Sequence, residues 1–207
     1  MSIKIRKAEA TDASFLAQMI LQSSRAGKKI GMFDLIFDNM DDKDVLKNIE
    51  KLTRTQTKNH CQYSNFLVAQ VDDKCVGTLC SYEPRLVSQE KLLEALKEIG
   101  CDSSVDEKLS VICECSFELN SRTLVFDFME ELADYRDVGI LKALTQKSLL
   151  TARLKGYRIV QAVIEIGSLD KKLYYEKLGF KEVKTKKCDI YQEKFGREGL
   201  ILFEMKF

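Results

Sequence analysis

Arg136 and Gly139 stand immediately before a long amphipathic segment, an arrangement that can bind phosphate groups. Apolar residues at helical spacing, Ile140, Leu141 and Leu144 among them, predict a helix from about 137 to 155. The first turn of a helix presents unpaired backbone N–H groups and the positive end of the helix dipole, which together hold a pyrophosphate without basic side chains. A glycine there lets a ligand approach the backbone closely. Many plain helices also begin with Arg-x-x-Gly, so this segment alone leaves both interpretations open.

Seven cysteines and one histidine are the other residues with distinctive chemistry. The cysteines are scattered and odd in number, with no CxxC pair, and in a reducing compartment we expect them to be small apolar core residues; they lie at positions 61, 75, 80, 101, 113, 115 and 188. Cys113 and Cys115, even with His60 or Cys61, match no usual zinc spacing, so we expect no metal site. His60 lies in a polar run and is expected in a surface loop. As the sole histidine, it excludes any mechanism that needs two.

The chain as a whole has the composition of a globular protein. Its 207 residues, 45% hydrophobic and 31% charged, fit one domain with a sizeable core. A formal net charge of +1 provides no global attraction for nucleic acid, and no such partner is expected. The first residues lack the apolar core of a signal peptide, and no apolar stretch approaches the roughly 20 residues of a membrane helix. The sequence therefore predicts a cytoplasmic protein without membrane association.

Hydrophobic periodicity predicts alternating strands and helices. We expect one mixed α/β domain, because the predicted order is β-α-α-α-β-β-α-β-α-β-α-β-β. Strands are expected at 3–6, 66–71, 75–80, 124–128, 159–166, 180–183 and 200–207. Helices are expected near 12–20, 33–37, 42–55, 92–99, 137–155 and 169–178. The run at 159–166 is almost entirely apolar, which is typical of a central strand covered on both faces.

Three segments of this chain resemble the GNAT (GCN5-related N-acetyltransferase) superfamily. Residues 135–141, Tyr-Arg-Asp-Val-Gly-Ile-Leu, are similar to its acetyl-CoA-binding signature Arg/Gln-x-x-Gly-x-Gly/Ala. Residues 173–180, Leu-Tyr-Tyr-Glu-Lys-Leu-Gly-Phe, look like its Leu-Tyr-Glu-Lys-Leu-Gly-Phe segment. Residues 3–12 resemble its usual first strand and helix cap. The likeness spans roughly 1–26 and 66–183, and the two downstream segments occur in the family's order.

The resemblance implies a single GNAT-like acetyltransferase domain over 1–207. Its fold would be a mixed, mostly antiparallel twisted sheet flanked by helices, with the fourth strand (about 124–131) and the fifth (159–166) splayed apart. The stretch at about 85–121 exceeds what a simple hairpin needs. We expect a helical insertion there, which either shapes the acceptor pocket or makes an oligomer contact such as a homodimer.

The resemblance also implies acetyl-CoA as co-substrate. The pantetheine arm would enter between the splayed strands, and the pyrophosphate would lie at the helix start. The residues implied to bind this cofactor are Ala133, Arg136, Asp137, Val138, Gly139, Ile140, Leu141, Ser168 and Lys172. The chain departs from the family pattern in four places: Ala133 replaces a usual proline, Leu141 a small residue, Ser168 an asparagine and Lys171 an alanine.

Tyr175 falls on the position of the family's tyrosine near the thioester sulfur, where a phenol can protonate the departing thiolate. One of Tyr174 and Tyr175 should be a core residue and the other should face the cleft, and we assign the cleft to Tyr175. The base that deprotonates the amine is assigned to Glu131 or Glu130, with Asp127 behind them. Only one of these two glutamates can face the cleft, because consecutive strand residues point to opposite faces. A solvated strand end is the alternative for either.

The predicted function is transfer of an acetyl group from acetyl-CoA to a primary amine by direct attack in a ternary complex, without a covalent enzyme intermediate. The acceptor is expected to be a small molecule or a peptide amine. The alternative is a GNAT-fold module that binds CoA or another ligand as a sensor or interaction module, without turnover.

Overall fold

A seven-stranded sheet organises the chain in the computed structural model, which describes residues 2–38 and 40–207. Its spatial order is β1-β2-β3-β4-β5-β7-β6. The strands are β1 (Ile3–Lys7), β2 (Phe66–Val71), β3 (Lys74–Tyr82), β4 (Leu124–Glu131), β5 (Ile159–Glu165), β6 (Lys181–Lys187) and β7 (Gly199–Lys206). All neighbouring strands pair antiparallel except β4 and β5, which are parallel.

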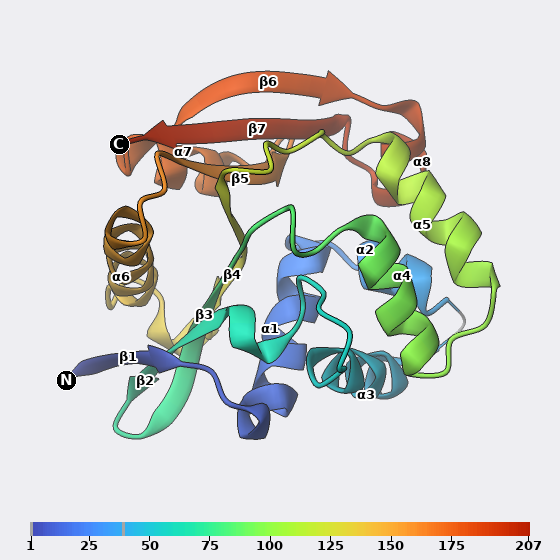
Figure 1. Cartoon of the computed structure of the whole chain (residues 1–207), viewed down its shortest axis with the longest axis horizontal. Coiled ribbons are helices and arrows are strands. Elements are labelled where there is room, and N and C mark those ends of the chain that lie inside the picture. Colours follow the sequence, from blue (N-terminus) through green and yellow to red (C-terminus); the bar gives the residue numbers. More distant parts are fainter. Residues whose placement is uncertain (1, 39) are drawn as a thin grey trace.

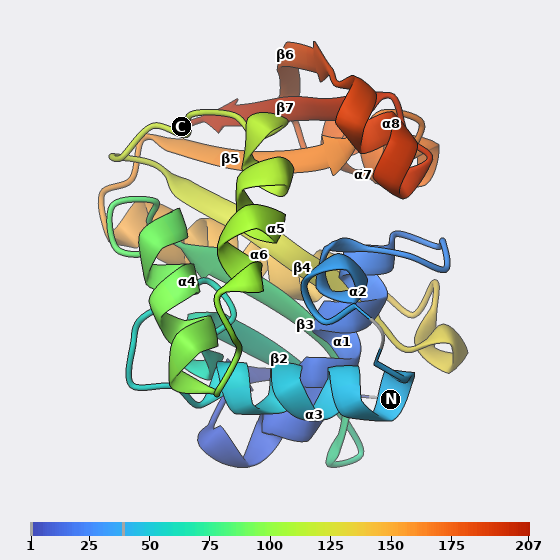
Figure 2. The ribbon, with the colours of Figure 1, turned by 90° about the vertical axis from the view of Figure 1, so that its right-hand side faces the viewer.

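The parallel pair at the centre of the sheet is short. Only Leu124, Val125 and Phe126 of β4 pair with β5, opposite residues 160–162. Beyond Phe126 the two strands diverge, as Figure 2 shows. The predicted fold class, a mixed and mostly antiparallel sheet that splays between its fourth and fifth strands, is confirmed.

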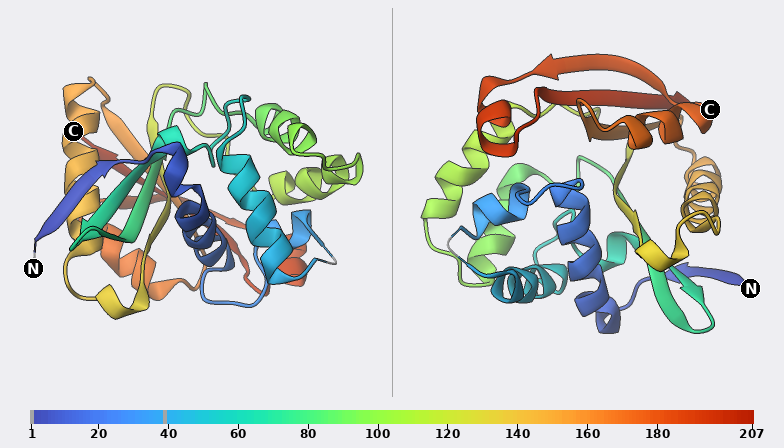
Figure 3. Two further views of the ribbon diagram at one scale, coloured as in Figure 1. Left: turned by 90° about the horizontal axis from the view of Figure 1, so that it is seen from below. Right: turned by 180° about the vertical axis from the view of Figure 1, so that it is seen from behind.

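Two groups of helices cover the two faces of the sheet, as Figures 1 and 3 show. One apolar cluster joins α6 (Ile140–Leu154) and α7 (Leu169–Lys177) to residues such as Phe126 and Phe203 of the sheet. The other cluster joins the opposite face to α1 (Ala13–Arg25), α2 (Met32–Ile36), α3 (Asp42–Thr53), α4 (Gln89–Glu98) and α5 (Ser104–Glu114). No helix of residues 2–38 and 40–207 is long and apolar enough to cross a membrane.

A β-bulge interrupts β4 where the strands separate. Phe126 packs in the cluster under α6 and α7, whereas Phe128 packs in the opposite cluster, although residues two apart on a regular strand share a face. The pairing with β3 shifts between Thr78 and Cys80, opposite Glu130 and Asp127. Phe128 has a φ of 41°, which is unusual for an aromatic residue. The bulge therefore changes which side chains face the helices just beyond the end of the parallel pairing.

Two helices differ from the sequence-based expectation. Residues 104–114, left unassigned, form α5, and a short helix, α8 (Asp189–Phe195), lies between β6 and β7. The segment between β3 and β4 thus contains α4 and α5. Figure 1 shows α5 beside α8, far from it in sequence.

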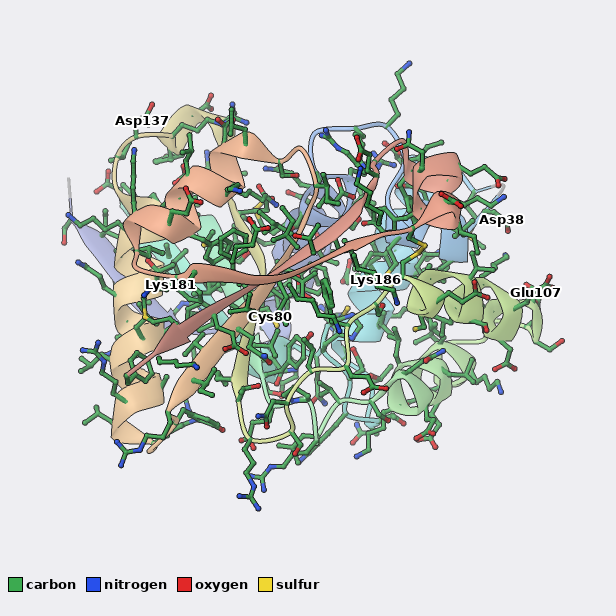
Figure 4. The ribbon with its side chains drawn as sticks, turned by 90° about the horizontal axis from the view of Figure 1, so that it is seen from above. Asp38, Cys80, Glu107, Asp137, Lys181 and Lys186 are labelled. Carbon is green, nitrogen blue, oxygen red and sulfur yellow. A yellow bond between two sulfur atoms is a disulfide. The ribbon has the colours of Figure 1, made fainter. Side chains whose placement is uncertain are left out.

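The expectation that all seven cysteines are unpaired is wrong for two of them. Cys115, at the end of α5, forms a disulfide with Cys188, at the start of α8, and their Cα atoms are 5.8 Å apart. The remaining five, at positions 61, 75, 80, 101 and 113, are free. Lys186 strengthens this junction by donating to the backbone carbonyls of Glu114 (2.6 Å) and Ser116 (3.2 Å), and Figure 4 shows it on β6 beside α5. The disulfide was missed because its partners are 73 residues apart.

Candidate functional site

The N-terminus of α6 presents backbone N–H groups that have no acceptor. The helix begins at Ile140, and no side chain caps it. Within residues 2–38 and 40–207, the N–H groups of residues 137–140 donate no hydrogen bond. Asp137 (φ 64°) and Gly139 (φ 93°) both adopt left-handed backbone conformations, and no heavy atom lies within 4 Å of where a Cβ on Gly139 would stand. This loop, marked by Asp137 in Figure 4, can receive an anion.

Glu131 lies near this helix start. Burial raises the pKa of its carboxyl group, and the backbone N–H of Leu141, one of the groups assigned to the pyrophosphate, lowers it. The Leu141 side chain packs against the apolar cluster under α6. The larger side chain at this position therefore packs in the core.

A cavity of about 350 Å³ lies where β4 and β5 separate. Its walls come from the bulge of β4, the end of β5 and the start of α7. The remaining walls come from the ends of α1 and α2, the segment of α4 and α5, and α8. Several of the side chains that line the cavity are aromatic, among them Tyr82, Phe128, Tyr175 and Tyr191. The cavity thus adjoins the mouth through which the resemblance brings the pantetheine arm.

Asp127 lines this cavity at the bulge. Its Oδ1 accepts a hydrogen bond of 2.8 Å from the backbone N–H of Phe128. Burial raises the pKa of Asp127 to about 6, while the Phe128 N–H and the charge of Lys171 act in the opposite direction. A carboxyl group with such a pKa can exchange a proton near neutral pH.

Tyr175 also lines the cavity, and its ring packs on Phe180 (ring centroids 5.1 Å apart) and Phe203 (6.1 Å). Only 4% of the residue is exposed, and burial strongly raises the pKa of its phenol. Tyr174 turns toward α6, where its hydroxyl and that of Thr145 are 3.1 Å apart. Both tyrosines pack in the core, and Tyr175 is the one that reaches the cavity.

Glu130 is held in a polar network at the end of β4. Its carboxylate accepts hydrogen bonds from Lys171 (2.9 Å) and from Gln22 (3.1 Å). Lys171 belongs to α7, which follows β5, so this ion pair bridges the two diverging strands. The ion pair thus joins the end of β4 to the helix that follows β5.

The other residues assigned to CoA are spread around the same region. Ala133 is exposed in a short 3-10 turn before α6, and Arg136 and Val138 are exposed beside it. Ser168 precedes α7 and lines the cavity. Lys172 forms an ion pair of 2.9 Å with Glu182 on β6. The structure brings the loop residues together and places Lys172 in a separate ion pair.

His60 lies in a loop, as expected, but the expectation that it faces the surface is wrong. His60 lines the cavity, and its ring stacks on Phe128 (centroids 5.6 Å apart) and tilts against Tyr82 (5.9 Å). Burial lowers the pKa of His60 to about 4, so the ring is neutral at neutral pH. Its polar sequence neighbours concealed this position. Asp127 was considered only as a residue behind Glu130 and Glu131, because the sequence of β4 gives no sign of the bulge that exposes it to the cavity.

The fold and this site define a class: the splayed sheet, with a helix start and a cavity at the splay, is the acetyltransferase fold of the GNAT superfamily. No protein-family profile matches the chain, and no curated protein matches it in sequence.

Solved structures show the similarity over nearly the whole chain. An N-acetyltransferase from Staphylococcus aureus Mu50 is 16% identical, with 98% of this chain and 100% of that chain covered and a TM-score of 0.73. A GCN5-related N-acetyltransferase from Kribbella flavida is 17% identical, with 99% and 98% covered and a TM-score of 0.60. The PaiA N-acetyltransferase from Thermoplasma acidophilum, solved in complex with coenzyme A, is 14% identical, with 100% of both chains covered and a TM-score of 0.54. The predicted GNAT fold is therefore confirmed.

Proposed function

We propose that this protein is an N-acetyltransferase that transfers an acetyl group from acetyl-CoA to a primary amine within a ternary complex. One observation carries the proposal: a cavity lined by Asp127 and Tyr175 opens where β4 and β5 separate, and the helix that follows β4 starts with free N–H groups. An activated acyl group held in the splay would meet an acceptor held in the cavity. The fold supports acyl transfer as a class of chemistry, and these residues support the reaction.

The residues around the helix start suit the phosphates of CoA. Arg136 supplies a positive charge, and the N–H groups of residues 137–140 supply four donors. The N–H of Leu141, which lies near Glu131, is a fifth proposed donor. Ala133, Ser168 and Lys172 are further proposed contacts, and Lys172 would exchange its ion pair with Glu182 for a phosphate.

Two side chains of the cavity would move the protons. Asp127 accepts the first proton that the acceptor's ammonium group loses. Tyr175 donates its phenolic proton to the leaving sulfur and regains a proton from the nitrogen as the amide forms. When bound, acetyl-CoA supplies a thioester whose carbonyl carbon gains a bond to nitrogen as its bond to sulfur breaks. Burial keeps the phenol of Tyr175 protonated until that step, because it raises its pKa.

Asp127 is preferred as the base because it reaches the cavity without an ion pair. Glu130 is neutralised by Lys171, and Glu131 is not among the described residues that line the cavity. The initial assignment to Glu131 or Glu130 remains the competing proposal. Asparagine or glutamine replacements of the three carboxylates separate the two, because only the base should abolish turnover while leaving acetyl-CoA affinity unchanged.

A second function is favoured by the ion pair across the splay. Lys171 and Glu130 close part of the route that the arm of CoA would take, which suits a module that binds CoA or another ligand without turnover. Cytoplasmic location, a homodimer and the absence of a nucleic-acid partner remain predictions from the sequence.

The test is calorimetric titration with acetyl-CoA, with ATP and desulfo-CoA as comparison ligands. We expect micromolar binding that weakens at least tenfold in Val138→Glu, because the new charge repels the pyrophosphate at the helix start. Val138 is 38% exposed, so the fold should tolerate the change.

The matched control is Val138→Gln, which has the same size without the charge and should bind nearly as well as the original chain. Unchanged affinity in Val138→Glu would place acetyl-CoA elsewhere and contradict the proposed site. Binding without acetylation of any amine would favour the sensor.

A further inference from the structure

The acceptor side of the cavity has features that select among amines. Its volume of about 350 Å³ lies near the lower end of the range of roughly 300–1,000 Å³ for small-molecule pockets. Leu92 of α4 and Leu109 and Ile112 of α5 form one wall. A second wall is aromatic, with the stacked rings of His60 and Phe128 beside Tyr82. Such surroundings favour a compact ligand whose body is apolar.

Glu165, the second carboxylate on the cavity wall, is already neutralised. Its Oε1 accepts hydrogen bonds of 2.8 Å from Lys28 and from the hydroxyl of Tyr191. Its Oε2 lies 3.3 Å from Nε of Arg197. Because Lys28 and Arg197 already compensate the negative charge of Glu165, this carboxylate is not available to bind a positively charged group of a ligand.

Asp127 differs, because it forms no ion pair within the described residues, 2–38 and 40–207. Its one direct partner is the N–H of Phe128 on Oδ1, so Oδ2 is available to a donor. His60 nearby on the wall is neutral, and it does not repel an ammonium group. The cavity therefore offers one anionic anchor, set among aromatic rings that also attract cations.

Lys171 is the one lysine or arginine among the described residues that line the cavity, and Glu130 neutralises it at 2.9 Å. A ligand carboxylate would have to displace Glu130 to gain a partner. Amino acids are therefore disfavoured as ligands, and polyamines are disfavoured because Glu165 cannot serve their second charge.

We propose that the acceptor is a compact, apolar primary monoamine without a carboxylate, of the alkylamine or arylalkylamine class, with its ammonium group on Asp127. This inference rests on the proposed acetyl transfer for the fate of the amine, but binding of the amine can be measured alone. The segment that carries α4 and α5, together with α8, then acts as the part of the chain that sets acceptor size.

The experiment is calorimetry of the full chain with 2-phenylethylamine and with hexylamine, in the absence of acetyl-CoA. Three comparison ligands each change one property: phenylalanine adds a carboxylate, 2-phenylethanol removes the charge, and spermidine adds charges. We expect both monoamines to bind at least tenfold more tightly than any of the three. Asp127→Asn should weaken monoamine binding at least tenfold, whereas Asp170→Asn, the same change at an exposed position of α7, should not alter it.

Circular dichroism of Asp127→Asn verifies that the variant is folded. Equal binding of phenylalanine or spermidine, unchanged binding in Asp127→Asn, or no monoamine binding at millimolar concentration would overturn the inference. Asp127-dependent monoamine binding by a chain that does not bind acetyl-CoA would leave this inference standing and refute acetyl transfer. Acetylation of spermidine or of a lysine peptide in preference to the monoamines would support acetyl transfer and refute this inference about the acceptor.

Discussion

Replacing Asp127 by asparagine should make the protein more stable while removing its proposed anchor. Burial raises the pKa of Asp127 to about 6, compared with about 3.9 for an aspartate in an unfolded chain. A difference of about two pH units between the folded and unfolded pKa corresponds to about 3 kcal/mol at neutral pH. Asparagine has nearly the same shape, and its oxygen can still accept the N–H of Phe128. We therefore expect Asp127→Asn to raise the free energy of unfolding at neutral pH by up to about 3 kcal/mol.

The pH dependence of this gain has a definite sign. Between about pH 4 and pH 6 the folded state binds more protons at Asp127 than the unfolded state, so the stability of the original chain falls as pH rises. The gain in Asp127→Asn should therefore be small near pH 4 and complete above about pH 7. Other titratable groups that act on Asp127 or sense its charge are still present in the variant; they are Cys61, Cys80, Tyr82, Lys171, Tyr175 and Tyr191.

The assay is urea denaturation of both chains at several pH values, with the difference in free energy plotted against pH. A control with Asp170→Asn should show almost no difference, because that residue is exposed. A variant that is less stable at neutral pH, or a difference that does not change with pH, would refute the account of Asp127 as a buried, destabilised carboxyl group.

Three further predictions concern the neighbouring residues. Lys171→Met should tighten acetyl-CoA binding by up to about fivefold, because a partly exposed ion pair is worth up to about 1 kcal/mol. The same variant should bind ATP as the original chain does. Equal effects on both ligands would show that Lys171 does not obstruct the pantetheine arm. Tyr175→Phe should lower kcat by about 10²–10⁴-fold with little change in calorimetric acetyl-CoA affinity, and an unchanged kcat would exclude a general acid there. Cys115→Ser should lower the free energy of unfolding by about 2–4 kcal/mol in urea denaturation, whereas Cys113→Ser should not; a reductant that leaves the original chain unaffected would contradict this role of the disulfide.

The elements that the sequence predicts well are those with a long, regular pattern. The apolar run at 159–166 forms β5, and the apolar stripe from 137 to 155 contains α6. Burial of a whole face requires apolar residues at regular spacing, and this spacing can be recognised in the sequence. α8 has seven residues, too few for a helical period to show. α5 could have been found, since Val105, Leu109 and Ile112 lie at helical spacing, but polar residues precede it and obscured the stripe.

The candidate site was predicted in part, and the limit has a physical cause. Local motifs located the helix start at Gly139 and the ring of Tyr175, because backbone conformation and helix spacing depend on near neighbours. The cavity instead depends on contacts between distant segments, such as the approach of α5 to α8 through Cys115 and Cys188. The spacing of apolar residues along the sequence does not indicate which distant segments meet. The acceptor side of the site could therefore be identified only from the structure.

The two halves of the site also differ in how much they constrain the chain. The half assigned to CoA uses backbone N–H groups and one glycine, so most side chains at 136–141 can vary without loss of the donors. The acceptor half depends on a carboxylate that burial disfavours and on a bulge that places Phe128 at a strained φ of 41°. Strained backbone and disfavoured charges are often found at ligand sites, although Phe128 itself also packs in the apolar core. The bulge places the half-buried carboxylate of Asp127 on the wall of the cavity, and this geometry is the physical reason to regard the cavity as a binding site.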